Sequence, residues 1–387
     1  MPLSRVSFPA RDRLAHAYPT TRSRTEWTLS QKRLPLAIVK PVFVFSGMGP
    51  QWWGMGQQLF ERERVFREFV TRADALFQAE SGWSILAEMR RTKETSRINQ
   101  TIIAQPGIFV LQAGLVELLG SWGVRPAAVI GHSLGENAAA YAAGALTLEQ
   151  ALHVVYHRSQ TLARAAGTGG GMLAVGLSED EALAVIAPYG DKVTVAAING
   201  LTRVTLAGDT DALAEVAARL KVKSIFHRTL RVEAAYHSCY MESFKQPLID
   251  ALADLRPSLP GVGMYSTVTG AAVSELAYDG PYWARNIRES VQFVRAFASS
   301  INDGHRLFLE IGAHPVLTAS MREYAALTKA DLTVISTLVR EADECTTLFK
   351  SLAGLYAAGC DPAYPWPRER HEEEAELALE HPCSRRF

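Results

Sequence analysis

The chain has 387 residues, of which 48% are hydrophobic and 21% are charged, a composition that is ordinary for a globular protein. It carries 40 basic and 40 acidic residues, so the formal net charge is zero and no charge excess points to nucleic acid or an anionic membrane as a partner. We expect no apolar stretch of this sequence to be long and uncharged enough to span a bilayer. The length suits one large domain with an insertion, or two domains.

The four cysteines are scattered and show no C-x-x-C spacing, so neither a zinc site nor a disulfide framework is indicated. Reduced thiols in a cytoplasmic compartment are therefore expected. Residues 1–33 are rich in Arg and Ser and poor in acidic residues, which is typical of an organellar transit peptide and equally of a linker from a larger polypeptide. Cytoplasmic and organellar locations both stay open.

The first organised element is expected to be a buried strand at residues 41–45, followed by a loop at 46–51. Two helices are then predicted, around residues 65–79 and 105–119, and an amphipathic helix from about 148 to 165.

The most informative stretch is Gly131-His132-Ser133-Leu134-Gly135. It follows an apolar run at residues 127–130 and precedes an Ala-rich helical run at 137–143. Strand, G-x-S-x-G and helix in this order are the context that a nucleophile elbow requires. The glycines permit a tight turn, and the serine beside a helix N-terminus is placed to attack a carbonyl and form an acyl-enzyme.

A different pattern begins at Gly169-Gly170-Gly171, which is interpreted as a hinge. A hairpin turn is predicted at Asn199-Gly200, between two alternating runs. The expected elements follow the order β-α-β-β-α-β and lie at residues 172–177, 178–188, 193–198, 203–207, 211–220 and 226–232. That order predicts a small ferredoxin-like unit.

Strands at residues 308–312 and 333–336 indicate that the first pattern resumes after this unit. The predicted fold class is therefore α/β, a large α/β-hydrolase-like subdomain with an inserted small ferredoxin-like (βαββαβ) subdomain. The expected boundaries are a linker-like segment at 1–38, the large subdomain at 39–170 and 234–358, the small one at 171–233, and a solvated linker or tail at 359–387.

Ser133 needs a base, and the chain offers ten histidines. His132 is adjacent to the serine and is expected to point away from it. His153 and His157 share the helix that also carries Arg158, where surface or packed roles are expected. His237 follows the last strand of the small unit, where the chain returns to the main body and would line the cleft. It is the candidate base, with a buried core histidine as the alternative.

The chain resembles the malonyl-CoA:acyl-carrier-protein acyltransferase family, in particular the acyltransferase domains of fatty-acid and type I polyketide synthases. The resemblance covers roughly Leu36 to Tyr356, with Met48 where many members carry Gln. The matching motifs, in chain order, are Phe45-Ser46-Gly47-Met48-Gly49-Pro50-Gln51, Ala104-Gln105-Pro106, Gly131-His132-Ser133-Leu134-Gly135-Glu136, Arg158, His237-Ser238, Tyr282-Trp283-Ala284-Arg285-Asn286, and Glu310-Ile311-Gly312-Ala313-His314-Pro315-Val316-Leu317.

The resemblance implies roles for these residues. Ser133 would attack the thioester of an acyl-CoA, and His237 would accept its proton and return it to the leaving thiol. The oxyanion would be held by the backbone N–H groups of Met48 and Leu134. The base is oriented by a main-chain or amide carbonyl near Asn286, which is the candidate orienting residue.

The resemblance also implies a substrate-binding set of Arg158, Gln105 and Tyr236. The Arg158 guanidinium would grip the free carboxylate of a malonyl or methylmalonyl group and oppose neutral acyl groups. Tyr236, which precedes the base, would shrink the room for a 2-methyl group, and Leu134 after the nucleophile favours the same choice. Malonyl is expected, with methylmalonyl as the alternative.

The implied function is transfer of malonyl from malonyl-CoA to the phosphopantetheine thiol of an acyl carrier protein, supplying extender units for polyketide or fatty-acid synthesis. No bound metal or redox cofactor is expected, since coenzyme A and 4'-phosphopantetheine belong to the substrates. A ketosynthase domain is a further expected neighbour, and neither nucleic acid nor a membrane is. A serine hydrolase and an inactive docking domain are the competing interpretations.

Overall fold

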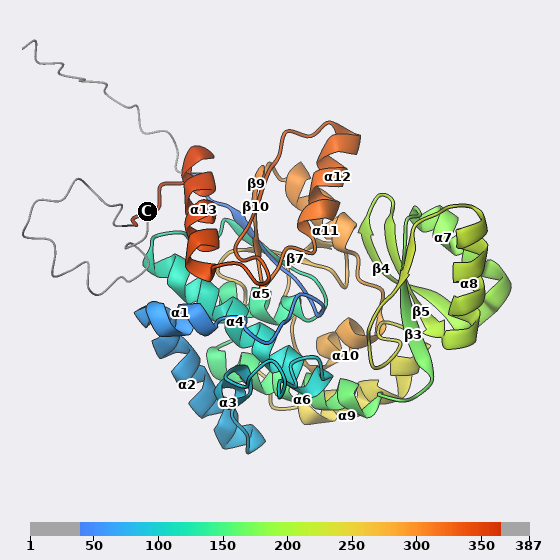
Figure 1. Ribbon diagram of the computed structural model, residues 1–387, viewed down its shortest axis with the longest axis horizontal. Coiled ribbons are helices and arrows are strands. Elements are labelled where there is room, and N and C mark those ends of the chain that lie inside the picture. The colour runs from blue at the N-terminus through green and yellow to red at the C-terminus, as the bar shows by residue number, and fades with distance from the viewer. Residues whose placement is uncertain (1–38, 365–387) are drawn as a thin grey trace, which may run out of the picture. The chain divides into compact units, whose positions relative to one another are not determined.

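Two β-sheets organise residues 39–364, the part of the chain that the computed structural model describes (Figure 1). Five neighbouring strands of the larger sheet are parallel, and the sixth pairs antiparallel at one edge. The strands lie in the order β10 (Thr333–Ser336), β9 (Leu307–Ile311), β1 (Val42–Phe45), β2 (Ala128–Gly131), β7 (Gly263–Ser266) and β8 (Ala271–Ala272).

Strand β1 reads Val-Phe-Val-Phe and is entirely buried, because helices cover both faces of the sheet. Phe43 and Phe45 face the core that includes α4 (Thr101–Ser121) and α5 (Gly135–Ala142). Val42 and Val44 face the opposite core, under α11 (Phe293–Asn302) and α12 (Thr318–Thr328). The alternation of side chains along one strand thus separates two helical layers.

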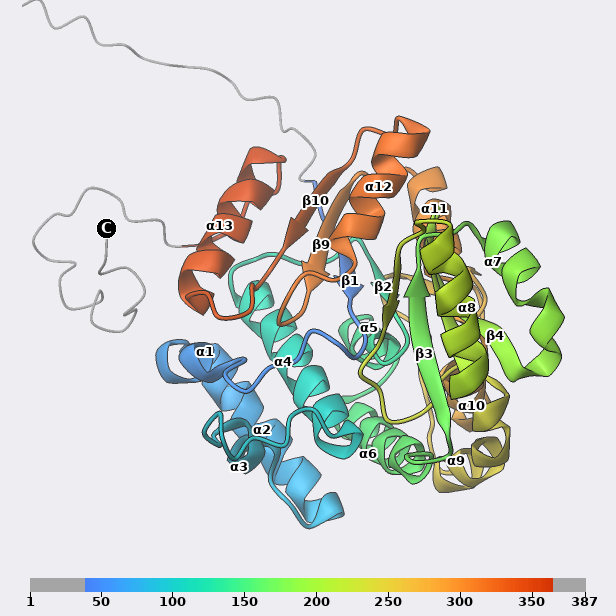
Figure 2. The same cartoon turned by 45° about the vertical axis from the view of Figure 1, so that its right-hand side comes forward.

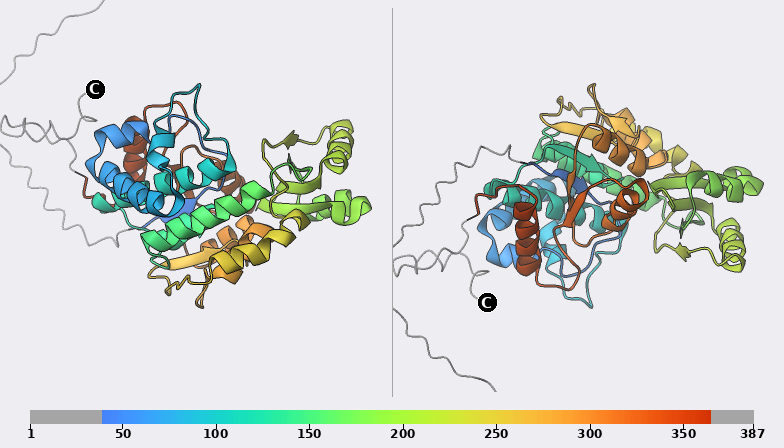
Figure 3. Two further views of the ribbon diagram at one scale, coloured as in Figure 1. Left: turned by 90° about the horizontal axis from the view of Figure 1, so that it is seen from below. Right: turned by 90° about the horizontal axis from the view of Figure 1, so that it is seen from above.

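The other helices of the larger body surround this sheet (Figure 3). They are α1 (Gln57–Arg62), α2 (Arg64–Ser81), α3 (Ile85–Met89), α6 (Leu148–Arg164), η2 (Cys239–Phe244), α9 (Lys245–Ala251), α10 (Gly280–Arg288) and α13 (Glu344–Ala357). The predicted helices at 65–79, 105–119 and 148–165 correspond to α2, α4 and α6. Strands β7 and β8 were not predicted.

The expectation that no apolar stretch is long enough to span a bilayer was wrong. Helix α4 is long and apolar enough to cross a membrane by length and composition, although its most apolar window is 83% buried inside the protein. The helix is apolar on all sides because it packs between the sheet and other helices, including α2 and α6.

The smaller sheet is antiparallel throughout, in the order β4 (Val193–Gly200), β5 (Arg203–Asp209), β3 (Gly170–Val175), β6 (His227–Thr229). Helix α7 (Glu179–Ile186) and the short 3-10 segment η1 (Ala187–Lys192) precede β4, and α8 (Thr210–Val222) precedes β6. Figure 2 shows α7 and α8 beside the strands of this sheet. The chain order β-α-β-β-α-β and this strand order are those of a ferredoxin-like unit. The boundaries proposed for it stay a prediction.

Two local predictions in this unit were wrong. Gly170 and Gly171 begin β3 instead of forming a hinge, and Gly170 is required for close approach, since an added Cβ would lie 2.6 Å from the Cβ of Ala235. The hairpin turn is Leu201-Thr202. Asn199 is instead part of β4, at an irregularity in the register, where its amide donates to the Thr205 hydroxyl at 3.2 Å.

The backbone joins the edge of the smaller sheet to the larger body. In β4, Ile198 donates its N–H to the carbonyl of Val291 at 2.9 Å, and Val291 donates to the carbonyl of Ala196 at 2.9 Å. Val291 lies just before α11, which packs on the larger sheet. The smaller sheet is therefore attached at a point close to the end of α10.

The expectation of reduced thiols does not hold for every described cysteine. Cys239 is an exposed free thiol and Cys360 a buried one, whereas Cys345 is disulfide-bonded. The spacing of the cysteines did not indicate this, because disulfide pairing depends on proximity in the fold.

Replacing Gly131 by Ala should destabilise the fold, because the added Cβ would lie 2.2 Å from the Cα of Glu136, a backbone atom that cannot move aside. We expect the free energy of unfolding to fall by about 3 kcal/mol or more in urea denaturation. The matched control is Gly261→Ala, whose Cβ would meet nothing closer than the carbonyl oxygen of Ala143 at 3.5 Å. A Gly131→Ala variant as stable as this control would contradict the packing argument.

Candidate active site

Ser133 lies in the turn between β2 and α5, with a φ of 52° that non-glycine residues rarely adopt. Close packing around the turn maintains it. A Cβ on Gly135 would lie 2.2 Å from the carbonyl oxygen of Phe45, so only glycine lets α5 begin this close to β1. The predicted nucleophile elbow is therefore present, with the serine at the start of a helix.

The Ser133 Oγ lies 2.8 Å from Nε2 of His237. The other ring nitrogen, Nδ1, lies 3.0 Å from the main-chain carbonyl oxygen of Glu289. A carbonyl oxygen can only accept, so Nδ1 carries the proton and Nε2 is left as the acceptor of the serine hydroxyl. This tautomer is the one a general base requires.

His237 sits between β6 and η2 and is 7% exposed, with a φ of 59°. Its N–H donates to the carbonyl of Ile287 at 3.2 Å, which ties the base to the end of α10. Burial, and then the positive charge of Arg158, lower the pKa of His237 to about 3. The imidazole is therefore neutral near pH 7.

Arg158 projects from α6 and is 1% exposed. Its guanidinium donates to the Ser133 Oγ at 3.1 Å, to Oδ1 of Asn286 at 3.1 Å, and to Oε1 of Gln105 at 2.6 Å. All three acceptors are neutral, so the charge is buried without a directly bonded carboxylate. Burial lowers the pKa of Arg158 to about 10, which still leaves it charged at pH 7.

Gln105 comes from α4 and is completely buried. Because its Oε1 accepts from Arg158, its Nε2 is directed elsewhere, and among the described residues that nitrogen has no hydrogen-bond partner. A buried N–H without an acceptor is costly and calls for a ligand atom. Because the Gln105 oxygen is already bonded to Arg158, the two side chains offer only N–H donors to a ligand.

Asn286 does not play the part expected of its amide. Its Oδ1 accepts from Arg158, and its Nδ2 donates to the Ser133 carbonyl and to Glu136 Oε2, both at 3.2 Å. The carbonyl that accepts from the base belongs to Glu289, although the main chain of Asn286 also favours protonated His237. Of the two predicted kinds of carbonyl near Asn286, the main-chain one therefore contacts the histidine, whereas the amide of Asn286 is directed at the arginine.

Glu136 is a completely buried carboxyl group that the sequence analysis left without a role. It accepts from Asn286 and the Tyr282 hydroxyl, and from both the N–H and the hydroxyl of Thr267. Burial raises its pKa, and these donors oppose the rise. Glu136 is connected to Arg158 indirectly, through Asn286.

Met48 lies in the loop that follows β1. A Cβ on the neighbouring Gly47 would lie 3.6 Å from the Cβ of Ser133, so this loop runs beside the nucleophile. Within the described residues, neither Met48 nor Leu134 donates its main-chain N–H to a protein acceptor. Arg340, which sequence analysis missed, binds the carbonyls of Gly49, Pro50 and Gln51 at 3.1 to 3.2 Å and fixes the loop.

Tyr236 is 7% exposed, and its hydroxyl lies 2.8 Å from that of Thr101 at the start of α4. Thr101 is itself fixed, because its N–H donates to Glu233 at 3.0 Å. The ring is therefore held in one place near Arg158, with which it interacts electrostatically.

His132 points away from Ser133, as expected. Its Nε2 donates to Oδ1 of Asn199 at 2.7 Å, which joins the elbow to the smaller sheet. No sequence signal pointed to Asn199, Glu289 or Arg340, since each acts across the fold. Glu136 does carry a signal, because it directly follows the G-x-S-x-G stretch.

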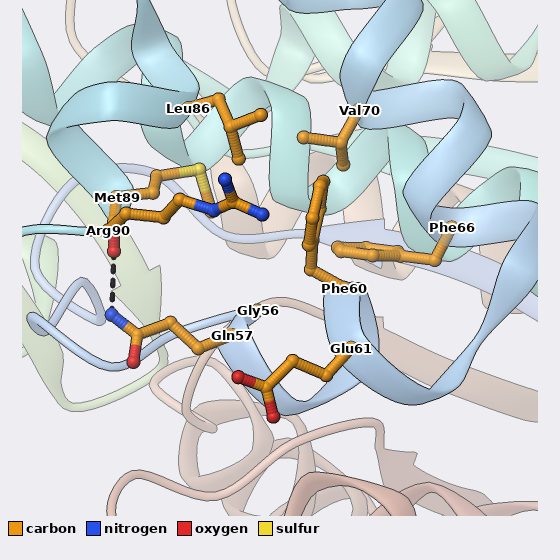
Figure 4. A pocket seen from close by; sticks show the side chains of 9 residues that line it. All are labelled: Gly56, Gln57, Phe60, Glu61, Phe66, Val70, Leu86, Met89 and Arg90. Atoms are coloured by element: carbon orange, nitrogen blue, oxygen red, sulfur yellow. Dashed lines mark hydrogen bonds between the residues drawn. The ribbon is translucent and has the colours of Figure 1, made fainter.

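Two surface cavities lie away from this site. One of about 280 Å³ is enclosed by α1, α2 and α3, where Arg90 lies over the ring of Phe60 at 4.6 Å and Gln57 donates to the carbonyl of Met89 (Figure 4). The other, of about 480 Å³, lies between α9 and the start of α10. Ser133 lines neither cavity, so neither contains the candidate nucleophile.

Comparison with known proteins identifies the family. Residues 42–362 match the acyl transferase domain family. The chain is 36% identical over 326 residues to the mycoketide-CoA synthase of Mycobacterium tuberculosis, covering 84% of this chain and 8% of that protein. It is 37% identical over 336 residues to the highly reducing polyketide synthase sdnO of Sordaria araneosa, covering 82% of this chain and 11% of that protein.

Solved structures agree. The acyltransferase domain from module 8 of the salinomycin polyketide synthase matches with a TM-score of 0.81 and 33% identity, covering 84% of this chain and 76% of that one. The loading acyltransferase from the avermectin modular polyketide synthase matches with a TM-score of 0.77 and 34% identity, covering 81% and 99%. The chain spans about a tenth of the length of the two curated relatives. With a family match over most of its length, the chain belongs to the acyl transferase domain family.

Proposed function

We propose that this domain transfers malonyl from malonyl-CoA to the phosphopantetheine thiol of an acyl carrier protein, through an ester on Ser133. One observation carries the choice of substrate: a buried guanidinium, bonded only to neutral groups, lies 3.1 Å from the nucleophile. An acyl group attached to Ser133 that also bears a free carboxylate would bring its negative charge to this cation.

The first half-reaction is an acyl transfer to the serine. Ser133 Oγ attacks the thioester carbonyl while His237 Nε2 takes the hydroxyl proton. The imidazolium is stabilised by the Glu289 carbonyl, which accepts from Nδ1. When the tetrahedral intermediate collapses, the carbon–sulfur bond breaks and His237 returns the proton to the sulfur of coenzyme A.

The negative charge that develops on the carbonyl oxygen needs preorganised donors. We assign this role to the main-chain N–H groups of Met48 and Leu134, with the N-terminus of α5 adding its positive dipole. Since the donor is the main-chain N–H and not the side chain, Met48 can serve at a position where many members of the family carry Gln. Arg340 acts as a positioning residue, since it holds the loop that presents Met48.

Arg158 discriminates between acyl groups by its charge. A malonyl carboxylate can accept from the guanidinium and from the unpartnered Nε2 of Gln105. A neutral acetyl group in the same place would desolvate these donors without pairing them, and breaking a buried ion pair by removing one partner typically costs about 3–5 kcal/mol. The site therefore favours a dicarboxylic acyl group.

The second half-reaction returns the acyl group to a thiol. The phosphopantetheine sulfur attacks the Ser133 ester, and His237 accepts the thiol proton and gives it to Oγ. Support for a carrier protein, and for a neighbouring ketosynthase, comes from the relatives, which are polyketide synthases several times longer than this chain. A hydrolase would instead pass the ester to water, so the lifetime of the acyl-enzyme distinguishes the two.

Malonyl rather than methylmalonyl is proposed because Tyr236 is held rigidly. Its hydrogen bond to Thr101 stops the ring from turning aside for a 2-methyl group. A single methyl group is worth only about 1–3 kcal/mol of discrimination in such a pocket, so the preference is expected to be a ratio and not an absolute exclusion.

Intact-protein mass spectrometry tests the reaction class and substrate together. After brief incubation with equal amounts of acetyl-, malonyl- and methylmalonyl-CoA, we expect a malonyl adduct that Ser133→Ala abolishes. Arg158→Ala should lower the rate of malonyl adduct formation by 100-fold or more, for a loss of about 3 kcal/mol, and improve acceptance of acetyl-CoA. Release of CoA without an adduct would indicate hydrolysis. An Arg158→Ala variant that still prefers malonyl would overturn the role of the arginine.

The pH dependence of acylation tests the state of His237. With a pKa near 3, the base stays neutral as the pH falls from 8 to 5, so kcat/KM for acylation should stay nearly flat. An ordinary imidazole with a pKa of about 6.5 would lose about 30-fold by pH 5. In Arg158→Ala with acetyl-CoA, the pKa of His237 should rise because a neighbouring positive charge is removed. The fall in kcat/KM on the acid side of the pH profile should therefore move to higher pH. A limb near pH 6.5 in the unmodified protein would contradict the burial argument.

The specificity argument is tested at Tyr236. In Tyr236→Ser, competition between malonyl- and methylmalonyl-CoA should shift toward methylmalonyl by about 10-fold, because the ring no longer fills the space. Tyr236→Phe keeps the bulk but removes the hydrogen bond to Thr101, so it should shift the ratio by less than Tyr236→Ser and measure how much the fixed ring position contributes. An unchanged ratio in Tyr236→Ser would show that other residues set the preference.

A further inference from the structure

Three metal-ligating side chains meet on the outside of the contact between α2 and α6. Glu80 lies near the end of α2, while His153 and His157 lie one turn apart on α6. Glu80 Oε1 is 2.5 Å from His153 Nδ1 and 3.3 Å from His157 Nε2, and the three ligand atoms lie within 4.8 Å of one another. Helix α6 packs against both α2 and α9 (Figure 3).

The tautomer of His153 makes this cluster informative. Its Nε2 lies 3.2 Å from the main-chain carbonyl of Ala251, at the end of α9, and a carbonyl oxygen can only accept. The proton therefore sits on Nε2, and in the neutral ring Nδ1 directs a lone pair at the Glu80 carboxylate. Two acceptors this close repel each other unless a proton or a metal ion lies between them.

His157 turns its Nε2 toward the same carboxylate oxygen. Hydrogen bonds from both rings to Glu80 would need a second proton on His153, at Nδ1 as well as at Nε2, whereas a metal ion can take a lone pair from each ring. A metal ion can satisfy all three side chains at once.

We propose that Glu80, His153 and His157 bind a divalent transition-metal ion of the zinc class, with water completing a tetrahedron. Two histidines at i and i+4 on one helix face are a known zinc-binding arrangement, and imidazole with carboxylate suits Zn²⁺. Zinc bonds of about 2.0–2.1 Å place tetrahedral ligand atoms about 3.3–3.4 Å apart. The Glu80–His157 separation already matches, and the partly exposed Glu80 side chain has room to withdraw from His153.

The outer contacts fit a metal site as well. The Ala251 carbonyl orients His153 in the manner of a carbonyl behind a ligating histidine. The side chains are 27% to 32% exposed, so an ion reaches them from solvent without opening the core. The ion would link α2 to α6. Arg158, which directly follows His157 on α6, lies in the candidate acyl site. This inference departs from the sequence-based expectation of no metal and does not depend on the proposed acyl transfer.

The test uses the full chain without a histidine tag, stripped of metal and titrated with Zn²⁺ by isothermal calorimetry. We expect one ion per chain, a rise in melting temperature, and, with Co²⁺ in place of Zn²⁺, the intense visible absorption of a tetrahedral site. Glu80→Gln and the double change His153→Ala, His157→Ala should each weaken Zn²⁺ binding by at least about 100-fold.

Two control variants separate this site from adventitious binding. His227→Ala removes a partly buried imidazole on β6, and Cys239→Ser removes the exposed free thiol, so both should bind Zn²⁺ like the unchanged chain. Circular dichroism should show all variants folded. Absence of stoichiometric binding to the unchanged chain, or binding that survives the double change or Glu80→Gln, would overturn the proposal and leave a proton-bridged ion pair.

Discussion

The functional geometry depends on one strained turn. Ser133 is held at a φ of 52° because Gly131 and Gly135 allow α5 to lie against β1 and β2 without Cβ atoms in the way. Such a conformation costs of order 1–3 kcal/mol and persists only where the surrounding packing enforces it. The same turn places Oγ toward His237 and His132 toward Asn199 of the smaller sheet. Loss of the turn would separate both pairs.

Around this turn, a buried charge organises the polar groups. Arg158 brings together residues from α4, the turn before α5, and α10, and its field contributes to keeping His237 neutral. Glu136 is set one residue further away, behind Asn286, where burial raises its pKa. Among the described residues no carboxylate is bonded directly to Arg158, as the proposed binding of a substrate carboxylate requires, because such a group would compete for the cation.

The smaller sheet completes the site from the other side. Its edge strand β4 is hydrogen-bonded to Val291, and Asn199 of the same strand accepts from His132. His237 follows β6, on the connection back to the main body, and its Nε2 lies 2.8 Å from Ser133 Oγ. Asn199 and His237 thus contact the elbow directly, whereas Val291 fixes the edge of the smaller sheet. Its glycines serve close packing, as at Gly170 against Ala235, and not the hinge that the sequence indicated.

The sequence by itself determined the elbow, the class of fold and the order of elements in the smaller sheet, because each rests on residues that are close together in the chain. The roles of Arg158, Gln105 and Tyr236 came from a resemblance, since no local pattern marks a buried arginine. Only the tertiary structure decided that the carbonyl of Glu289 sets the tautomer of His237, that Asn286 holds Arg158, and that Glu80 faces two histidines of α6. The physical reason is that hydrogen-bond direction and burial depend on neighbours that the fold brings from distant parts of the chain.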